Sequence, residues 1–381
     1  MHKLKFIKLS FEMNINLKQK LMRTKVNENL FNGQPFYVGI DTHKKSWTVS
    51  IYGEQYEHKT MSQNPDPELL ASYLRRNFPG GDYHAVYEAG FSGFGACRRL
   101  RELGVDCIVA HPADVPTSTK EKLQKTDPVD SRKLGRSLRS LEFEGIHIPE
   151  VKLEADRALV RQRFRVVKDL SRTKNRVKSL FFQFGIEIPE RFTSAQTRHW
   201  SKEFINWLKA LSIQESSLKQ TADNYVQIGE SQRSTLLMLN RQVRTLSQTE
   251  SYKGNYLLLI SIPGIGVTTA MHILTQLGDI MRFECLDDLC NYVGLVPKMH
   301  GSGEKMKTGK MIKRGRKELK IMLIEASWEA VRKDPALMAK FNDLSLRMNK
   351  NKAIIRIARK MLSRIRYVLS HQEEYQMGVV C

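Results

Sequence analysis

The stretch Phe36-Tyr-Val-Gly-Ile-Asp-Thr-His-Lys-Lys-Ser-Trp-Thr-Val-Ser-Ile51 decides how this chain begins to fold. Apolar side chains occupy every second position from Phe36 to Ile40 and again from Trp47 to Ile51, which is the period of a half-buried β-strand. The polar run that starts at Asp41 separates the two patterns and suits a turn. We therefore predict a β-hairpin over this stretch.

Strand and helix patterns alternate beyond this hairpin. A helical pattern over Glu68–Asn77 precedes a short apolar run over Tyr83–Glu88, which suits a buried strand. A second helix through Arg98–Leu103 then leads into a strand over Asp106–Ala110. Because strands that alternate with helices are typical of an α/β layer, we predict an α/β domain over residues 36–149.

The rest of the chain has different patterns. Strand signals are absent from residues 150–253, where long periodic stretches predict helices paired as an antiparallel coiled coil. Residues 254–381 are predicted to be mainly α-helical, with helices over Glu318–Lys333 and Lys352–Leu369. Residues 1–35 form a basic extension that we expect to be poorly ordered.

The chain carries a large positive charge. Its 381 residues include 62 Lys and Arg against 40 Asp and Glu, a formal net charge of +22 at pH 7. Such a surplus favours a polyanionic partner, and nucleic acid is the leading candidate. The longest apolar run, Tyr256–Val267, is too short to span a membrane and contains Pro263. We predict no membrane partner, no signal peptide and a cytoplasmic location.

The cysteines do not suggest a metal or disulfide framework. None of the five cysteines forms a C-x-x-C pair, which argues against a zinc ribbon. We expect Cys285 and Cys290 to be buried thiols.

Two acidic residues stand at predicted strand ends. Asp41 follows the first strand, and Glu88 ends the apolar strand that precedes Ala89-Gly90. Strand ends in open α/β sheets are the usual place for ligand sites. Taken alone, Asp41 also suits an ordinary turn, because aspartate initiates turns.

A second acidic pair lies in Asp127-Pro-Val-Asp130. The pair suits the start of a helix, with Asp127 as the N-cap, Pro128 at the first helical position and Asp130 in the first turn. The same spacing places both carboxylates on one side of that turn, where they can share a hard divalent cation with Asp41 and Glu88. Two-metal phosphoryl-transfer sites hold ions about 3.5–4 Å apart and need several convergent carboxylates. We therefore predict that these four acids form a catalytic metal site.

A serine lies in the basic, glycine-rich stretch Gly294-Leu-Val-Pro-Lys-Met-His-Gly-Ser-Gly303, which we predict to be a loop. The glycines beside Ser302 free the backbone to bring its hydroxyl close to a phosphate, where the serine can act as a nucleophile. The cations that follow would stabilise the transferring group. The alternative is a flexible, exposed linker serine. These cations are Lys305, Lys307, Lys310, Lys313, Arg314 and Arg316.

The predicted helical region begins with a basic stripe beside an apolar one. Residues 157–178 hold nine basic residues against the single acid Asp169. Such a helix can pack with one face and meet phosphates with the other, although a solvated face is the alternative. The predicted nucleic-acid contacts are Arg157, Arg161, Arg165, Lys168, Arg172 and Arg176.

A helix-hairpin-helix element is predicted at Ile262-Pro-Gly-Ile-Gly-Val-Thr-Thr-Ala270. Gly264 and Gly266 let backbones approach closely, and the following helix begins with free N–H groups that bind phosphate without reading sequence. An ordinary interhelical turn is as compatible with these residues, and both descriptions can hold together.

The motifs together resemble a known family. V-G-I-D-T-H-K, Y-E-A-G, K-T-D-P-V-D-S-R-K-L, P-G-I-G-x-x-T-A and G-L-V-P-x-x-x-G-S-G occur in that order. In this the chain is similar to the DEDD transposases of the insertion-sequence 110 family, whose members act as RNA-guided recombinases. The resemblance covers Phe36 to Leu369. One departure is Lys313-Arg-Gly-Arg316, where many relatives carry K-R-G-N.

The resemblance implies a fold, a site and partners. The fold would be a RuvC-like (RNase H-like) amino-terminal domain, a helical coiled-coil insert and a carboxy-terminal transposase domain. Asp41, Glu88, Asp127 and Asp130 would take the Mg²⁺-binding positions, and Ser302 would be the nucleophile. The implied partners are donor and target DNA, a noncoding guide RNA and further copies of the chain in a dimer or tetramer, with acids and serine from different protomers.

We therefore expect a DNA transposase that cuts and rejoins strands through a Mg²⁺-assisted serine. The cations Lys305, Lys307, Lys313 and Arg314 of the serine stretch would contact the nucleic-acid backbone. One alternative is a Mg²⁺-dependent RuvC-like junction endonuclease that uses water as its nucleophile. Another is a non-catalytic nucleic-acid-binding protein.

Overall fold

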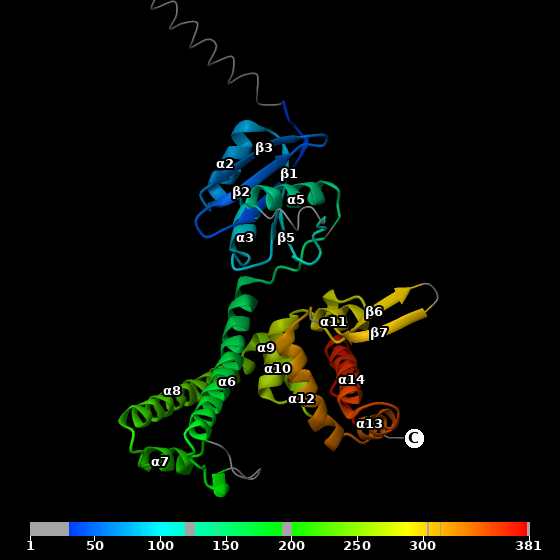
Figure 1. Cartoon of the computed structure of the whole chain (residues 1–381). Coiled ribbons are helices and arrows are strands. Elements are labelled where there is room, and N and C mark those ends of the chain that lie inside the picture. Colours follow the sequence, from blue (N-terminus) through cyan, green and yellow to red (C-terminus); the bar gives the residue numbers. More distant parts are fainter. Residues whose placement is uncertain are drawn as a thin grey trace, which may run out of the picture. The chain divides into compact units, whose positions relative to one another are not determined.

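The structure, a computed structural model, divides into two compact units. One ends at Ile148 and the other begins at Pro149, and each is described here by itself (Figure 1). The described residues are 30–118, 126–142, 144–192, 200–302, 305–312 and 314–378, with side chains for all of these except 299–302 and 305–308. The predicted basic extension therefore lies mostly outside the described residues.

The first unit contains a five-stranded mixed sheet. Its strands are β1 (Pro35–Thr42), β2 (Trp47–Tyr52), β3 (Glu57–Gln63), β4 (Asp82–Glu88) and β5 (Asp106–Ala110), in the order β3-β2-β1-β4-β5. β1 and β2 pair antiparallel, which confirms the predicted hairpin, whereas β1, β4 and β5 run parallel. Strand β3 was not predicted, because this edge strand carries mainly polar side chains and lacks the apolar alternation of its neighbours.

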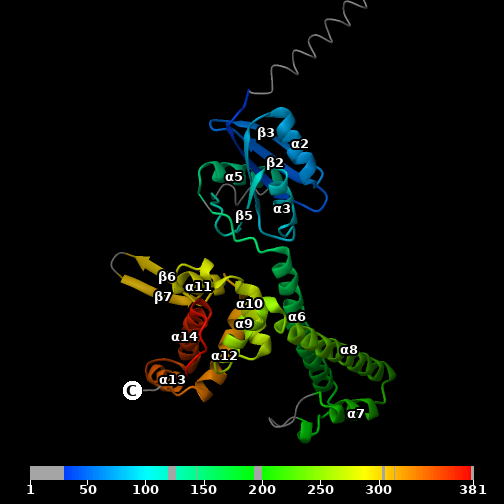
Figure 2. The same ribbon diagram turned by 180° about the vertical axis from the view of Figure 1, so that it is seen from behind.

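Helices cover both faces of this sheet (Figures 1 and 2). Phe36, Val38 and Ile40 point to the face covered by α2 (Pro67–Asn77) and α3 (Gly95–Glu102), where they share a core with apolar residues of both helices. The opposite face is covered by α5 (Asp127–Arg139), whose Leu134 and Leu138 pack with residues of β4 and β5. Because side chains alternate along a strand, the odd-numbered residues of β1 face α5.

Helix α5 lies directly against the backbone of β1. A β-carbon added to Gly39 would lie 2.0 Å from the carbonyl oxygen of Ser131 and 2.3 Å from the amide nitrogen of Gly135. The hydroxyl of Ser131 also lies 2.8 Å from that of Ser50 on β2, in a buried contact. This packing holds the first turn of α5 close to the end of β1.

We expect Gly39→Ala to destabilise the first unit strongly. The added methyl group would overlap backbone atoms of α5, which cannot move as a flexible side chain could, so we expect a loss of about 3 kcal/mol or more in unfolding free energy. Thermal or urea unfolding would measure it. Gly95→Ala is the matched control, because nothing lies within 4 Å of its added β-carbon. Equal stability of the two variants would contradict the described packing.

The second unit begins with a pair of long helices. In α6 (Val151–Gln183) and α8 (Ser216–Ser247), Arg163 donates to Asn240 and Thr173 to Gln232. The later residue of α6, Thr173, contacts the earlier residue of α8, Gln232, so the two helices run antiparallel. A short helix, α7 (Lys202–Ala210), and the 3₁₀ turn η1 (Glu190–Phe192) join a small aromatic core at one end of the pair.

A larger helical core follows. It is built on α9 (Glu250–Ile260), α10 (Val267–Leu277), α11 (Leu286–Val293), α12 (Lys317–Lys333), α13 (Pro335–Arg347) and α14 (Lys350–His371), with the 3₁₀ turn η2 (Ile280–Arg282). The turn between α9 and α10 confirms the predicted helical hairpin. Among the described residues, no helix is long and apolar enough to cross a membrane.

Two local predictions in the second unit are wrong. The glycine-rich serine stretch is not a loop, because it forms β6 (Pro297–Ser302), which pairs antiparallel with β7 (Lys305–Met311). Backbone hydrogen bonds hold such a ribbon, so the apolar pattern that signals a buried strand is absent. Cys285, predicted to be buried, is exposed at the N-cap of α11, while Cys290 is buried.

Candidate functional site

Two of the predicted acids lie on adjacent parallel strands. Ile40 of β1 is paired with Tyr87 of β4, so the next residues along, Asp41 and Glu88, end their strands side by side. Both occupy alternate positions to the core residues and therefore lie on the α5 face of the sheet. The fold brings these two carboxylates to one sheet edge.

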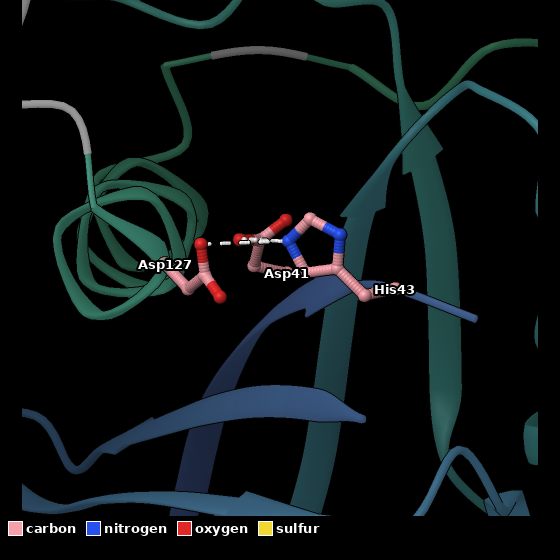
Figure 3. Close-up of side chains that lie close together, drawn as sticks. All are labelled: Asp41, His43 and Asp127. Carbon is pink, nitrogen blue, oxygen red and sulfur yellow. Dashed lines mark ion pairs between the residues drawn. The ribbon is translucent and has the colours of Figure 1, made fainter. Parts of the chain in front are cut away.

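The other two acids come from the first turn of α5. Thr126 is the N-cap residue and Asp127 is the first residue of the helix, so the predicted N-cap role of Asp127 is wrong. Its carboxylate is instead turned towards β1, where it meets His43 (Figure 3). The close contact between α5 and Gly39 therefore places Asp127 and Asp130 near the strand ends.

An imidazole joins one pair of acids. Nε2 of His43 lies 3.3 Å from Oδ2 of Asp41 and 3.5 Å from Oδ1 of Asp127 (Figure 3). The potential ligand atoms of these three residues all lie within 4.8 Å of one another. The sequence analysis did not select His43, although its position two residues after a strand-end aspartate was a usable signal.

An ammonium group joins the other pair. Nζ of Lys133 lies 3.4 Å from Oε1 of Glu88 and 3.3 Å from Oδ1 of Asp130, and the residue is only 8% exposed. A lysine three residues after an aspartate is common on helices, so the sequence offered no signal for this contact. Each pair of acids thus has a basic side chain between its members.

The electrostatics of the site favour a cation. Burial raises the pKa of Asp41, the negative charges of Asp127 and Asp130 raise it further, and the nearby His43 opposes the shift. Carboxylates that disfavour one another's ionised form are stabilised by a shared positive charge. Carboxylate oxygens and an imidazole nitrogen are both donors that divalent ions accept, so these residues fit a divalent metal.

We expect Lys133→Met to make the first unit more dependent on metal. Without metal the variant leaves Glu88 and Asp130 without their shared partner, which should cost about 1–3 kcal/mol in unfolding free energy. Added Mg²⁺ should restore stability and raise the melting temperature more than in the unmodified chain. Arg132→Met is the control, because Arg132 pairs with Glu57 instead. Equal Mg²⁺ shifts in all three proteins would argue against a cation near Lys133.

Ser302 belongs to the second unit, as the last residue of β6, and its Cα is paired with that of Lys305. The base of this hairpin is tightly held. The amide of Ile312 donates to the carbonyl of Val296, and a β-carbon on Gly315 would lie 2.7 Å from Cα of Gly294. Both glycines have positive φ, so the contact needs residues without a side chain.

The predicted basic stripe on α6 is divided by the structure. Arg157 is 6% exposed and donates to the backbone carbonyls of Thr275 and Gln276, so its predicted place on an open face is wrong. Val160, one turn further along α6, belongs to the same buried core as residues of α10. Further along, Arg165 and Arg176 are exposed.

The other residues predicted to contact nucleic acid differ in their exposure and in their partners. Lys168 lies over the ring of Phe164, and Arg172 pairs with Asp169. A β-carbon added to Gly264 would meet the backbone of α12, whereas one added to Gly266, just before α10, would meet no atom within 4 Å. Among the serine-hairpin cations, Arg314 is exposed, and the side chains of Lys305, Lys307 and Lys313 lie outside the described residues.

Comparison with known proteins agrees with these observations. The family described as "Transposase", of the DEDD type found in IS110, matches residues 38–185, and "Transposase IS116/IS110/IS902 family" matches residues 256–342. The transposase of insertion sequence element IS1533 from Leptospira borgpetersenii is 26% identical over 64% of this chain and 70% of its own length.

Two further relatives extend the comparison. The transposase-like protein y4qE of Sinorhizobium fredii is 29% identical over 64% of this chain, which spans 57% of that relative. A protein of Pseudomonas aeruginosa described as a family 20 transposase is 23% identical over 90% of this chain and 98% of its own length.

The acidic sheet edge and these matches together define the class as transposases, enzymes that cut and rejoin DNA. Within that class, the chain belongs to the DEDD transposases of the IS110 family.

Proposed function

We propose that this transposase cuts and rejoins DNA through a serine nucleophile assisted by Mg²⁺. Asp41, Glu88, Asp127 and Asp130 would hold the metal, and Ser302 would attack the scissile phosphodiester. The observation that carries the proposal is the convergence of the four acids at one sheet edge, around His43 and Lys133. The DEDD family match over residues 38–185 supports it.

The proposed reaction has two steps, cleavage of one strand and its transfer to another. The hydroxyl of Ser302 loses its proton as its oxygen forms a bond to phosphorus. The bond from phosphorus to one DNA sugar oxygen breaks, and that oxygen leaves as a hydroxyl after taking up a proton. A hydroxyl of the second strand then attacks the phosphoserine link and releases the serine. Mg²⁺, when bound, would polarise the phosphoryl oxygens and stabilise their developing charge.

His43 and Lys133 would tune the acidic site in this proposal. His43 would orient Asp41 and Asp127, and Lys133 would keep Glu88 and Asp130 directed at a common point. Fixed orientation matters, because small displacements of metal ligands reduce phosphoryl transfer strongly.

The finer features of the family belong to the same proposal. The mixed sheet flanked by helices is compatible with a RuvC-like domain, and the antiparallel pair of α6 and α8 with a coiled-coil insert. The net charge of +22 suits a protein that grips nucleic-acid backbone while a noncoding guide RNA selects sequence by pairing. Separate units carry the acids and the serine, which suits assembly of several copies.

A strand-transfer assay tests the proposal. The chain is incubated with Mg²⁺, labelled donor and target DNA and transcripts of the DNA flanking its gene. We expect joined products and a labelled DNA–protein adduct that protease removes. The second candidate is a junction nuclease that uses water as its nucleophile. The acids of the first unit support it, because a metal site of this kind can activate water without a serine. Such an enzyme would give free DNA ends without an adduct. DNA binding without any cleavage would contradict both enzymatic functions.

A further inference from the structure

A group of arginines converges in the second unit, with Glu318 and Asp279 as nearby counter-charges to Arg161 and Arg282. Arg161 comes from α6, Arg282 from η2 and Arg316 from the residue before α12, and Arg157 lies behind them. Within the described part of the chain, none of the four forms an ion pair with an aspartate or a glutamate. Positive groups held close together with few counter-charges repel one another, so the arrangement needs a reason.

Gln276 of α10 is the centre of this group. Its backbone carbonyl accepts from the hydroxyl of Tyr292 at 2.9 Å, and its side-chain oxygen accepts from Arg161 at 2.7 Å. Arg157 donates to the carbonyls of Thr275 and Gln276. These contacts fix Arg161 and Tyr292 relative to the same helix turn.

Tyr292 holds the other two arginines. The guanidinium carbons of Arg282 and Arg316 lie 4.5 and 4.8 Å from the centroid of its ring. Arg282 also donates through Nε to the carbonyl of Leu277 at 2.9 Å. Stacking and this hydrogen bond orient the guanidinium planes and leave other N–H groups available.

Several buried polar atoms beside these arginines have no partner. Nη2 of Arg282 and Nε2 of Gln276 form no hydrogen bond, and Gln276 is 2% exposed. Both ring nitrogens of the buried His272 are also without a hydrogen bond, and its pKa is lowered to about 4 by burial and the charges of Arg161 and Arg163. The nearest carboxylate to His272 is Glu318, at 3.8 Å. Oε2 of Glu318 is likewise buried without a hydrogen bond, so the polar groups beneath the arginines carry a desolvation cost.

The side chains of this group are partly exposed. Arg161, Arg282, Tyr292 and Arg316 are all half-buried, and Arg165, one turn along α6, is exposed. A ligand can therefore reach these side chains without unfolding the core. Guanidinium groups that are aligned by an aromatic ring suit a phosphate, which accepts several N–H donors at once.

We propose that Arg161, Arg282 and Arg316, aligned by Gln276 and Tyr292, form a binding site for a backbone phosphate of nucleic acid. This inference rests on the proposed function and adds a defined contact to it. The amide of Arg316 donates to the carbonyl of Tyr292, and the preceding Gly315 meets Gly294 at the base of the serine hairpin. A phosphate bound here would be held at a fixed position relative to that base.

The double variant Arg282→Gln, Arg316→Gln tests this site by binding alone. Probes are a duplex DNA of random sequence and a hairpin RNA, measured without Mg²⁺ over a series of KCl concentrations. Each phosphate contact contributes about 0.9 to the slope of log affinity against log salt on duplex DNA and about 0.7 on single strands. We expect the slope of at least one probe to fall by about 1 to 2, with roughly 10-fold or greater loss of affinity at low salt. The probe that responds identifies DNA or RNA as the source of the phosphate.

Two companion variants keep the result interpretable. Arg332→Gln removes one charge from an exposed part of α12, where Arg332 pairs with Glu329, and should leave the slope nearly unchanged. Arg282→Lys with Arg316→Lys keeps the charges and should recover most of the slope, even if loss of stacking lowers the melting temperature. A slope that stays at the unmodified value in the glutamine pair, or that falls equally in Arg332→Gln, would overturn the site.

The outcome is separable from that of the proposed catalysis. Asp66→Asn, which removes a carboxylate from the cap of α2 in the first unit, should bind both probes as tightly as the unmodified chain. An unchanged salt slope in the glutamine pair, together with normal formation of the serine adduct, would refute only this inference. The expected fall in salt slope in the glutamine pair, with no adduct formed by the unmodified chain under any condition, would refute only the proposed reaction.

Discussion

Ser302→Ala is expected to abolish both strand cleavage and the DNA–protein adduct. Removal of the attacking hydroxyl leaves no group to form the phosphoserine bond, so the rate should fall on the order of 10⁴-fold or more. Binding to DNA should remain, since the backbone pairing of β6 with β7 does not use the serine hydroxyl. The measurement is the yield of protease-sensitive, labelled adduct with Mg²⁺ present.

Two controls make the Ser302 result specific. Ser302→Cys keeps a nucleophile and should retain some adduct, which would now be linked through sulfur. Thr308→Ala removes a hydroxyl from the paired strand β7 and should leave the adduct at its normal level. Normal cleavage by Ser302→Ala, with free DNA ends, would instead identify water as the nucleophile and leave only the acidic site in the reaction.

Asp127→Asn is expected to remove most activity while leaving the fold almost intact. Asparagine keeps the size and hydrogen-bonding capacity of aspartate but loses the charge that would hold a metal, so cleavage should fall by about 10²- to 10³-fold. The unfolding free energy should change by less than about 1 kcal/mol, because Asp127 is the first helical residue and not the cap, and a negative charge at a helix start contributes about 0.3–1 kcal/mol. Mg²⁺ should also raise the melting temperature less than in the unmodified chain.

Asp66→Asn provides a matched comparison. Asp66 also precedes a proline at a helix start, and it caps α2 by accepting from the amides of Glu68 and Leu69. It has no contact with the four acids, so this variant should show full activity and a small change in stability. If Asp127→Asn lowered activity only in proportion to a loss of stability, the role of Asp127 would be confined to the start of its helix.

The first unit was largely predictable from its sequence. The apolar alternation of residues 36–40 and 47–51 defined the hairpin, and the strand over Asp106–Ala110 was placed with the observed bounds. The edge strand β3 was missed because it buries little apolar surface. Patterns of hydrophobic burial identify elements that pack on a core, but an edge strand is held mainly by backbone hydrogen bonds.

The candidate site was predictable only in part. The four acids could be chosen because each stands at a strand end or a helix start, where ligands gather. Lys133 could not be assigned to them, since its partners depend on how α5 packs against β1 at Gly39, whereas the place of His43 two residues after Asp41 was a usable signal. The same limit applies to Arg157, which has the sequence features of a surface cation and is buried against α10.

The amino-acid sequence by itself determined the alternation of strands and helices, the basic character and the order of the motifs that define the family, because these depend on local composition and spacing. Only the tertiary structure decided which side chains meet: the acids with His43 and Lys133, and the arginines with Tyr292 and Gln276. The physical reason is that each group is completed by a contact between distant segments, such as His43 with Asp127, Glu88 with Lys133 and Arg161 with Gln276. The energies of these contacts depend on distance and burial that no local pattern encodes.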